Sequence, residues 1–372
     1  MEIIMSVLAS IRKVSKISPI PNADAIEVAK IDGWEVVVKK GEFKEGDLCV
    51  YFQIDSFLPD KPVYSFLKNK TMMEGNVGYR LRTIRLRGQV SQGLALPLAD
   101  FGIIDAEEGD NVTEPLGVLK YEKPVPANLR GQVAGGRPSE IRKTDEERIQ
   151  NIKDSDFEQL LDRKVYKTLK RDGSSMTVFC LREEQKQDLG NGDYDITTSW
   201  RSGLCSRNLE LKENLDNTMW KCADELNLVS ALYKFCSEKG IALAVQGEIF
   251  GPGIQKNPHK VDKVQFEIFN IWNIDEQKYL TPLMVRTFIE ILKQLYGASQ
   301  LLDYVPSTEY AEPLRKFGET KEDLLKDADN NYKSPNGSYN EGFVYKLATP
   351  TEDDTITSFK VISNKYLLKM ED

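Results

Sequence analysis

A lysine, a carboxylate and a glycine turn lie together in the segment Lys170-Arg171-Asp172-Gly173. A lysine amine can act as a nucleophile that forms a covalent intermediate, and a carboxylate beside it can help to hold a metal ion. With ordinary residue frequencies, a Lys-x-Asp-Gly pattern should arise by accident in roughly one chain in ten of this length. The pattern is weak alone, so its meaning depends on the groups that follow it along the chain.

Several fragments with charged or aromatic side chains follow the lysine. Each one alone has an ordinary structural explanation, as a turn, a core strand or a solvated strand face. In chain order they are Ser206-Arg207, Gly247-Glu248, the strand from Phe266 to Ile271, Asn340-Glu341-Gly342-Phe343-Val344-Tyr345-Lys346, and Ser358-Phe359-Lys360-Val361.

Composition limits the class of protein. A chain of 372 residues exceeds what one hydrophobic core usually supports, so two domains are expected. No run of 18 apolar residues is present, and the start of the chain lacks the basic and apolar regions of a secretory signal. We therefore expect an intracellular protein without a membrane span.

Cysteine and histidine usage narrows the chemistry. The five cysteines are scattered, with no Cys-x-x-Cys pair, and His259 is the only histidine. Free, buried thiols are therefore expected, and zinc sites and Ser-His-Asp triads are disfavoured. A metal in this protein should be a hard cation, Mg²⁺ or Mn²⁺, held through carboxylates and water.

The net charge of −8 disfavours nonspecific coating of nucleic acid, but it hides a local basic patch. Between Lys61 and Gln92 there are seven positive residues and one negative residue, Glu74. Such an excess suits a phosphate backbone, although a solvated strand face would look the same. The candidate nucleic-acid contacts are Arg80, Arg82, Arg85 and Arg87.

The first 120 residues read as short strands separated by turns. Val28–Ile31 and Trp34–Val38 flank Asp32-Gly33, which is a strong hairpin signal, and Cys49–Phe52 follows another turn. The predicted fold of residues 1–120 is a small antiparallel β-barrel of the oligonucleotide-binding (OB) type.

A change in composition marks a second domain. Residues 121–143 are rich in Pro and Gly and are interpreted as a linker, which leaves residues 144–372 for the second domain. Thr144-Asp145-Glu146-Glu147 matches a capping box, so a helix is expected to open that domain. Thr281-Pro282 should begin another helix, with Val285, Phe288, Ile289, Leu292 and Leu295 on its apolar face.

Taken in order, the fragments resemble the nucleotidyltransferase motifs of polynucleotide ligases and capping enzymes. The chain is most similar to the Deinococcus-type ATP-dependent RNA ligases, which carry an OB domain ahead of the adenylyltransferase domain. Arg87–Leu94, Thr144–Asn151 and Phe250–Asn257 also resemble that family, so the resemblance covers almost the whole chain. It implies an α+β fold, in which an ATP-grasp-like ligase domain with antiparallel sheets follows the barrel.

The resemblance implies a reaction in three steps. Lysine attacks the α-phosphorus of ATP, AMP moves from lysine to an RNA 5′-phosphate, and a 3′-hydroxyl then displaces AMP. A free lysine has a pKa near 10.4, so roughly one amine in a thousand is unprotonated at neutral pH. Lys167, Arg171 and a bound metal are expected to lower the pKa of Lys170, whereas Asp172 opposes them.

The resemblance also assigns roles to residues. Lys170 is the nucleophile, Glu248 bonds the ribose, and Phe269, with Phe266 as the second choice, stacks on adenine. Lys360 and Arg207 meet the phosphates. The implied catalytic set is Lys170, Asp172, Glu248, Glu341 and Lys360; the nucleotide-binding set is Leu169, Lys170, Arg207, Glu248, Phe266, Phe269 and Lys360; the metal set is Asp172, Glu248 and Glu341.

One departure from the family pattern concerns the final motif, which usually has two lysines one residue apart. Here Lys360 is followed by Val361-Ile362, so the second phosphate contact is either missing or supplied by Lys346 or Lys365.

The sequence therefore favours a monomeric ATP-dependent RNA ligase that seals nicks in an RNA duplex or an RNA–DNA hybrid. A DNA-sealing or GMP-transferring relative is one alternative, but such enzymes place their OB domain after the lysine strand, and only twelve residues follow Lys360. The other alternative is a noncatalytic RNA-binding protein whose second domain has degenerated.

Overall fold

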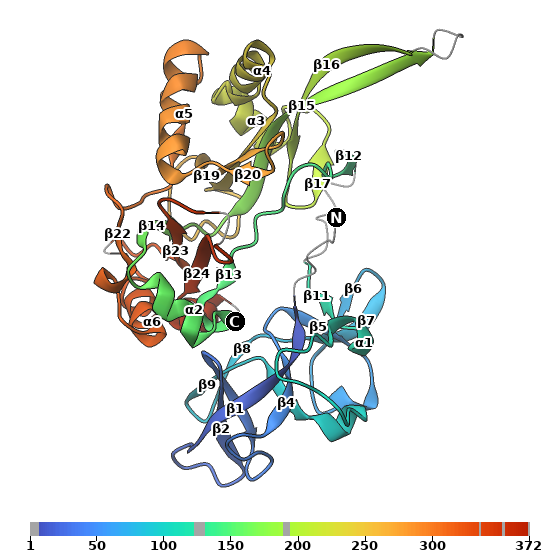
Figure 1. Cartoon of the computed structure of the whole chain (residues 1–372), viewed down its shortest axis with the longest axis vertical. Helices are drawn as coiled ribbons and strands as arrows, with labels where there is room; N and C mark the ends of the chain where they lie inside the picture. The colour runs from blue at the N-terminus through green and yellow to red at the C-terminus, as the bar shows by residue number, and fades with distance from the viewer. Residues whose placement is uncertain (1–6, 123–130, 189–193, 335, 352–353, 371–372) are drawn as a thin grey trace.

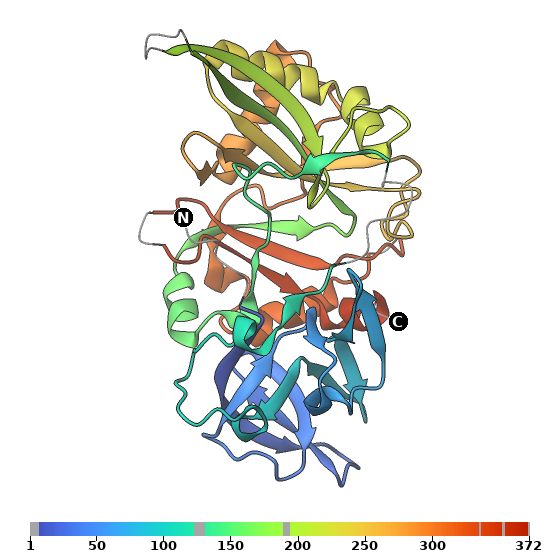
Figure 2. The ribbon, with the colours of Figure 1, turned by 90° about the vertical axis from the view of Figure 1, so that its right-hand side faces the viewer.

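The computed structural model describes residues 7–122, 131–188, 194–334, 336–351 and 354–370. Three tiers follow one another along the long axis of the molecule (Figures 1 and 2). A β-domain forms one end, a five-stranded sheet lies in the middle, and a larger sheet with its helices forms the other end. Within the described part of the chain, no helix is long and apolar enough to cross a membrane.

The N-terminal domain consists of three antiparallel sheets, with strand orders β10-β4-β1-β2-β3, β11-β5-β7-β6 and β8-β9. The predicted hairpin at Asp32-Gly33 is confirmed, because Ile31 pairs with Trp34 and Asp32 adopts a φ of 51°. The elements are β1 Ala9–Pro19, β2 Ile26–Ile31, β3 Trp34–Lys39, β4 Leu48–Phe52, β5 Ser56–Pro59, β6 Lys70–Met73, β7 Asn76–Arg80, β8 Thr83–Leu86, β9 Gln89–Gln92, β10 Leu94–Pro97, α1 Thr113–Leu116 and β11 Leu119–Lys120.

The larger sheet of the second domain has the order β12-β17-β16-β15-β18-β19-β20, and β21 pairs in parallel with β19. Buried apolar side chains from this sheet and from helices α3, α4 and α5 form one large core cluster. The elements are β12 Val133–Gly136, β15 Ser174–Asp188, β16 Tyr194–Cys205, β17 Leu209–Leu211, α3 Thr218–Glu225, α4 Leu228–Lys239, β18 Leu243–Phe250, β19 Gln265–Asn273, β20 Lys278–Tyr279, α5 Pro282–Leu295 and β21 Asp303–Tyr304.

The middle sheet has the order β13-β24-β23-β14-β22, and helices α2 and α6 share a hydrophobic core with it. Its strands carry the lysine of the first motif and both motifs near the end of the chain. The elements are β13 Glu147–Arg148, α2 Asp154–Leu160, β14 Lys164–Lys170, β22 Glu312–Pro313, α6 Lys321–Asn330, β23 Gly342–Leu347, β24 Ser358–Ile362 and α7 Asn364–Met370.

The two domains share a hydrophobic core. Ile362 at the end of β24 and Leu367 in α7 are buried in the same cluster as Trp34, Tyr51 and other residues of the N-terminal domain. Polar contacts continue this interface, because the Trp34 indole donates a hydrogen bond to Asn151 at 2.7 Å. The N-terminal domain is therefore packed directly against the middle sheet.

The capping-box prediction was wrong. Residues 147–148 form strand β13, a 3-10 helix follows at Ile149–Asn151, and the first α-helix of the domain starts at Asp154. The acidic side chains of the predicted box are bound elsewhere: Asp145 pairs with Lys120 and Arg207, and Glu146 accepts from Ser358. Tertiary ion pairs thus overrode a local helix signal.

The other predicted elements were confirmed only in part. The helix at Thr281-Pro282 is confirmed, and the Thr281 side chain accepts a hydrogen bond from the Met284 amide. Leu295, which was expected on its buried face, is 74% exposed. Part of the expected linker joins the larger sheet of the second domain, because Val133–Gly136 forms β12 beside β17. Residues 123–130 of that linker lie outside the described residues.

Candidate active site

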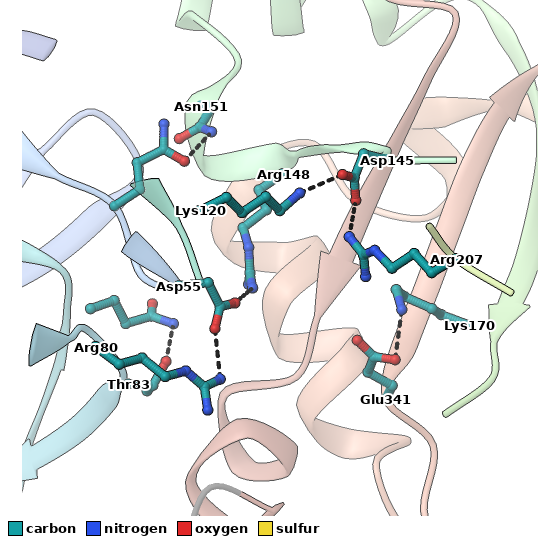
Figure 3. A network of polar contacts seen from close by, with 12 residues as sticks. Asp55, Arg80, Thr83, Lys120, Asp145, Arg148, Asn151, Lys170, Arg207 and Glu341 are labelled. Atoms are coloured by element: carbon teal, nitrogen blue, oxygen red, sulfur yellow. Dashed lines mark hydrogen bonds and ion pairs between the residues drawn. The ribbon is translucent and has the colours of Figure 1, made fainter. Parts of the chain in front are cut away.

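Lys170 is the last residue of β14 and lies opposite Gly342, the first residue of β23. A Cβ atom on Gly342 would lie 2.1 Å from the Val361 carbonyl oxygen, so this position requires glycine. The Glu341-Gly342 pair of the motif therefore has a physical role: the glycine lets β23 approach β24, and the glutamate before it faces the lysine. Lys170 Nζ donates to Glu341 Oε2 at 2.6 Å (Figure 3).

Carboxylates control the charge of Lys170. Burial favours the neutral amine, but the negative charges of Glu341, Glu248 and Asp172 outweigh this effect and raise the pKa of Lys170. Arg171 and Lys167, which were expected to lower this pKa, do not outweigh the carboxylates. The lysine is held as an ammonium ion until something offsets these negative charges.

The two cations expected to act on Lys170 are neutralised by other partners. Arg171 donates two hydrogen bonds of 2.7 Å to Glu267 and lies over the Phe250 ring. Lys167 pairs with Asp327 at 2.6 Å. Neither side chain delivers an unpaired positive charge to the nucleophile.

Glu248 reaches the site from β18, where it lies opposite Ser175. The turn at Gly173 passes so close to β18 that a Cβ atom there would lie 2.3 Å from the Ile249 carbonyl oxygen. Burial, supported by the charges of Glu341 and Asp172, raises the pKa of Glu248 to about 8, although Lys170 opposes the shift. Glu248 is thus a half-buried carboxyl whose ionisation depends on positive charge supplied nearby.

Asp172 completes the acidic set. Its main-chain N–H donates to His259 Nε2 at 3.0 Å, and its carboxylate accepts a hydrogen bond from the Tyr366 hydroxyl. Among the described residues, no three acidic, histidine or cysteine side chains converge tightly enough to ligate one ion directly. Three carboxylates around Lys170 without such convergence fit a hydrated Mg²⁺ or Mn²⁺ held through its water molecules.

A second group of charges lies on the side of the site nearest the N-terminal domain. Lys360 on β24 pairs in register with Arg148 on β13. Burial, followed by the positive charges of Arg148, Lys170 and Lys120, lowers the pKa of Lys360 to about 8, although Asp145 opposes them. A phosphate bound here would restore the charge of Lys360, so the lysine suits an anion.

Arg207 is held in the same region by Asp145. Its Nη2 lies 2.9 Å from Asp145 Oδ1, and Lys120 binds the other carboxylate oxygen. Figure 3 shows Asp145 between these two cations, with the Lys170–Glu341 pair nearby. Burial opposes ionisation of Asp145, but Arg207, Lys120 and Lys360 outweigh it and lower its pKa to about 2.

Neither candidate for the second motif lysine faces the phosphate side of the site. Lys346 is buried, and its Nζ donates to the Phe269 carbonyl at 2.5 Å and to Asn270 Oδ1 at 2.6 Å. Lys365 lies over the Tyr332 ring. The family position itself is occupied by Ile362, which is 3% exposed in the core shared by the domains.

The two aromatic candidates for adenine binding on β19 differ in burial. Phe266 is 3% exposed in the core against α3–α5, and a Cβ on Gly247 would collide with its ring. Phe266 is therefore unavailable for stacking on adenine. Phe269 is only partly buried and lies 5.8 Å from Lys346 Nζ, and Leu169 is fixed by its N–H to the Pro306 carbonyl at 2.7 Å.

The four candidate arginines of the N-terminal domain fall into one half-buried and three exposed side chains. Arg80 is half-buried, pairs with Asp55 at 2.7 Å and lies over the Tyr121 ring, so it holds the domain together and is not presented to RNA. Arg82, Arg85 and Arg87 are exposed on the hairpin of β8 and β9, where Arg85 donates to the Gly88 carbonyl. Only these three remain candidates for a phosphate backbone.

His259 and Tyr366 were not among the predicted site residues. Both reach Asp172 from far along the chain, across 87 and 194 residues respectively. His259 had been considered only as a catalytic base or metal ligand, and no local pattern in the sequence marks Tyr366. Their contacts depend on the tertiary fold.

An OB-like β-domain ahead of a lysine-centred α+β domain defines a covalent nucleotidyltransferase architecture. A family model described as an OB-fold domain matches residues 8–98, and one described as RNA ligase matches residues 163–362. The chain belongs to the RNA ligase family. None of the curated protein sequences matches it.

Solved structures of Naegleria gruberi RNA ligase are similar over almost the whole length. The structure with PPi is 39% identical, with 99% of this chain and 100% of that chain covered and a TM-score of 0.81. A mutant with ATP and Mn is 39% identical over 98% of this chain and 100% of that chain, with a TM-score of 0.80. Another mutant, with AMP and Mn, is 38% identical over 97% of this chain and 98% of that chain, also with a TM-score of 0.80. The predicted fold, an OB domain followed by an α+β ligase domain, is confirmed.

Proposed function

We propose that this RNA ligase uses ATP to seal nicks that carry a 3′-hydroxyl and a 5′-phosphate, through a lysyl-AMP intermediate on Lys170. The observation that carries the proposal is the set of charges that meets at Lys170. Its Nζ pairs with Glu341 at 2.6 Å, Glu248 and Asp172 add negative charge, and the positive charges of Lys170 and Lys360 act on one another. ATP brings negative phosphates, which suit the lysines, and a metal ion, which suits the carboxylates.

The acidic side chains keep the Lys170 amine protonated and are assigned to the ribose and the metal ion of the nucleotide. Glu341 pairs with the Lys170 amine at the end of β14. We assign Glu248, whose charge acts on Lys170, to the ribose. Asp172, Glu248 and Glu341 are the residues that would hold a hydrated Mg²⁺ or Mn²⁺. When bound, that ion supplies positive charge that offsets the carboxylates and favours the neutral amine. A Naegleria relative solved with ATP and Mn supports this choice of substrate and metal.

The basic side chains serve the phosphates. We assign Lys360 to the α-phosphate, where it would offset charge that develops as pyrophosphate leaves. Its lowered pKa, caused by burial and by neighbouring positive charges, supports this role. Arg207 can bind a phosphate in a bidentate manner once it leaves Asp145. The exposed arginines of the β8–β9 hairpin suit the RNA backbone, and we propose a nicked RNA duplex or an RNA–DNA hybrid as the substrate.

Within the family we propose the Deinococcus-type group, because the OB domain precedes the ligase domain and packs against β24 and α7. We also propose that the protein is a monomer. A location inside the cell is supported by its five cysteines, which are buried free thiols, as expected in a reducing compartment. A noncatalytic RNA-binding protein is disfavoured, because Lys170, Glu341 and Lys360 stand in one site.

Nick sealing tests the proposal. The purified protein, ATP and Mn²⁺ should convert a nicked RNA duplex to a sealed strand and release one AMP and one pyrophosphate per joint. Lys170→Arg should abolish sealing, because a guanidinium stays protonated, while Lys167→Arg serves as the matched control. Binding of RNA without sealing, in folded protein, would instead favour the noncatalytic alternative.

A further inference from the structure

Asp172 forms hydrogen bonds with two residues, His259 and Tyr366, that have no role in the proposed reaction. Its N–H donates to His259 Nε2, which lies 3.0 Å away, and its carboxylate accepts from the Tyr366 hydroxyl. A side chain that must help to hold a hydrated ion at a fixed distance from Lys170 cannot rotate freely. The partners that fix it therefore affect the site without touching the substrate.

Tyr366 is itself firmly held. Its amide donates to Ser363 Oγ at 3.1 Å, and Ser363 in turn donates to Asp329 at 2.7 Å. The next residue, Leu367, is buried in the core shared with the N-terminal domain. Helix α7 thus presents the Tyr366 hydroxyl from an anchored position.

His259 has no role as a general base in this arrangement. Nε2 accepts the Asp172 N–H, so the proton of the neutral ring is on Nδ1, which is buried and has no hydrogen-bond partner. The ring packs edge-on against Phe250, and the Arg171 guanidinium lies over the same Phe250 ring. His259 is placed to fix the main chain of the Lys-Arg-Asp-Gly turn.

We propose that Tyr366 and His259 are positioning residues for Asp172: Tyr366 orients its carboxylate and His259 its backbone, so that the carboxylate holds the hydrated metal. This inference rests on the proposed function. Residues that orient a metal-holding side chain typically change metal affinity or activity by about 10- to 100-fold when they are replaced.

Tyr366→Phe removes only the hydroxyl, and Tyr345→Phe is its matched control. Tyr345 is a buried tyrosine of the same domain whose hydroxyl has no hydrogen-bond partner. In Tyr366→Phe, the Mn²⁺ concentration that gives half-maximal lysyl-AMP formation should rise by about 10- to 100-fold. The KM for ATP at saturating Mn²⁺ and the thermal midpoint should match those of the control.

A binding measurement provides a readout without turnover. In the Lys170→Ala background, which cannot form the adduct, Mn²⁺ bound in the presence of ATP is measured by electron paramagnetic resonance. Adding Tyr366→Phe should weaken Mn²⁺ binding by the same factor, whereas adding Tyr345→Phe should leave it unchanged. Equal Mn²⁺ affinity in the two double variants would overturn the role of Tyr366.

Two substitutions test His259. His259→Gln keeps an acceptor that can reach the Asp172 N–H, and His259→Leu removes it. The glutamine variant should retain the parent Mn²⁺ dependence, and the leucine variant should show the shift expected for Tyr366→Phe. Identical behaviour of the two would overturn the role of His259.

The outcomes distinguish failure of the proposed function from failure of this inference. If the parent protein forms no lysyl-AMP at all, the proposed function fails. If the parent forms lysyl-AMP and these variants match their controls, only this inference fails.

Discussion

Charged residues behave differently in the site around Lys170 and on the β8–β9 hairpin of the N-terminal domain. In the site, Lys170 and Glu341 form a pair at 2.6 Å, and burial shifts the pKa values of Glu248 and Lys360 to about 8. On the hairpin, Arg82, Arg85 and Arg87 are exposed. Both regions are rich in charge, but the charged side chains of the site are half-buried and those of the hairpin lie in water.

The comparison shows that burial decides how much one charge matters. Electrostatic interactions are strong in a site that excludes water and are screened at an exposed surface. Substitutions in the site around Lys170 or in the core shared by the domains should therefore have large effects that salt hardly changes. Substitutions on the hairpin should have modest effects that depend on ionic strength.

The largest effect is expected at Ile362, the position where the family usually has a second lysine. Ile362→Lys would place a charge in the core shared by the domains and should cost about 3–5 kcal/mol of stability, as an uncompensated buried charge does. Chemical denaturation measures the loss, with exposed Leu295→Lys as the control, expected within about 0.5 kcal/mol. Unchanged stability with faster sealing would mean that the core shared by the domains tolerates the family lysine.

Glu341→Gln should affect the reaction more than the fold. The change keeps the size of the side chain but removes the charge that pairs with Lys170, and lysyl-AMP formation should slow by about 10²- to 10³-fold. Single-turnover labelling measures the rate. Glu312→Gln, which breaks an exposed pair with Lys316, is the control. A Glu341→Gln rate within about threefold of the parent would show that this carboxylate is dispensable.

The hairpin should respond through RNA binding alone. Replacing both Arg85 and Arg87 by alanine should reduce the slope of log affinity against log salt by about 2, near 0.9 per lost phosphate contact. Fluorescence anisotropy with nicked duplex at several salt concentrations measures the slope, and lysyl-AMP formation should be unchanged. Arg80→Ala should instead lower stability and leave the slope intact, because Arg80 is bound to Asp55. The reverse pattern would show that Arg80 is the phosphate contact.

The smallest effect is expected where the domains meet at the surface. Lys30 pairs with Glu322 at 2.8 Å across the interface, but both side chains are exposed. Lys30→Met should therefore change stability by less than about 1 kcal/mol, and the change should shrink as salt is added. Thermal unfolding at low and high salt measures it, with Lys316→Met as the control. A loss above about 2 kcal/mol would show that this pair carries the docking of the domains.

The sequence was informative where a signal is local. Asp32-Gly33 specifies a hairpin because a tight turn needs a positive φ, and Thr281-Pro282 specifies a helix start. Lys170 and Glu341 could also be selected, because the order of motifs along the chain is itself a strong pattern. These features depend little on the rest of the fold.

Features that depend on residues far apart in the chain could not be predicted from the sequence. The acidic residues after Thr144 resembled a helix cap, but Asp145 is bound to Lys120 and Arg207. Arg80 could not be distinguished from Arg85, because the difference lies in Asp55 and not in the segment itself. His259 and Tyr366 carry no motif, since their contacts with Asp172 arise only when distant segments meet.

Transfer of the nucleotide to Lys170 tests the central claim most directly. The protein is incubated with Mn²⁺ and ATP labelled at the α- or the γ-phosphate, separated under denaturing conditions, mapped by mass spectrometry and chased with a nicked RNA duplex. The account predicts a covalent label from the α-phosphate only, located on Lys170 and passed to the 5′-phosphate of the nick. A label on another residue, or no label in folded protein that binds ATP, would contradict it.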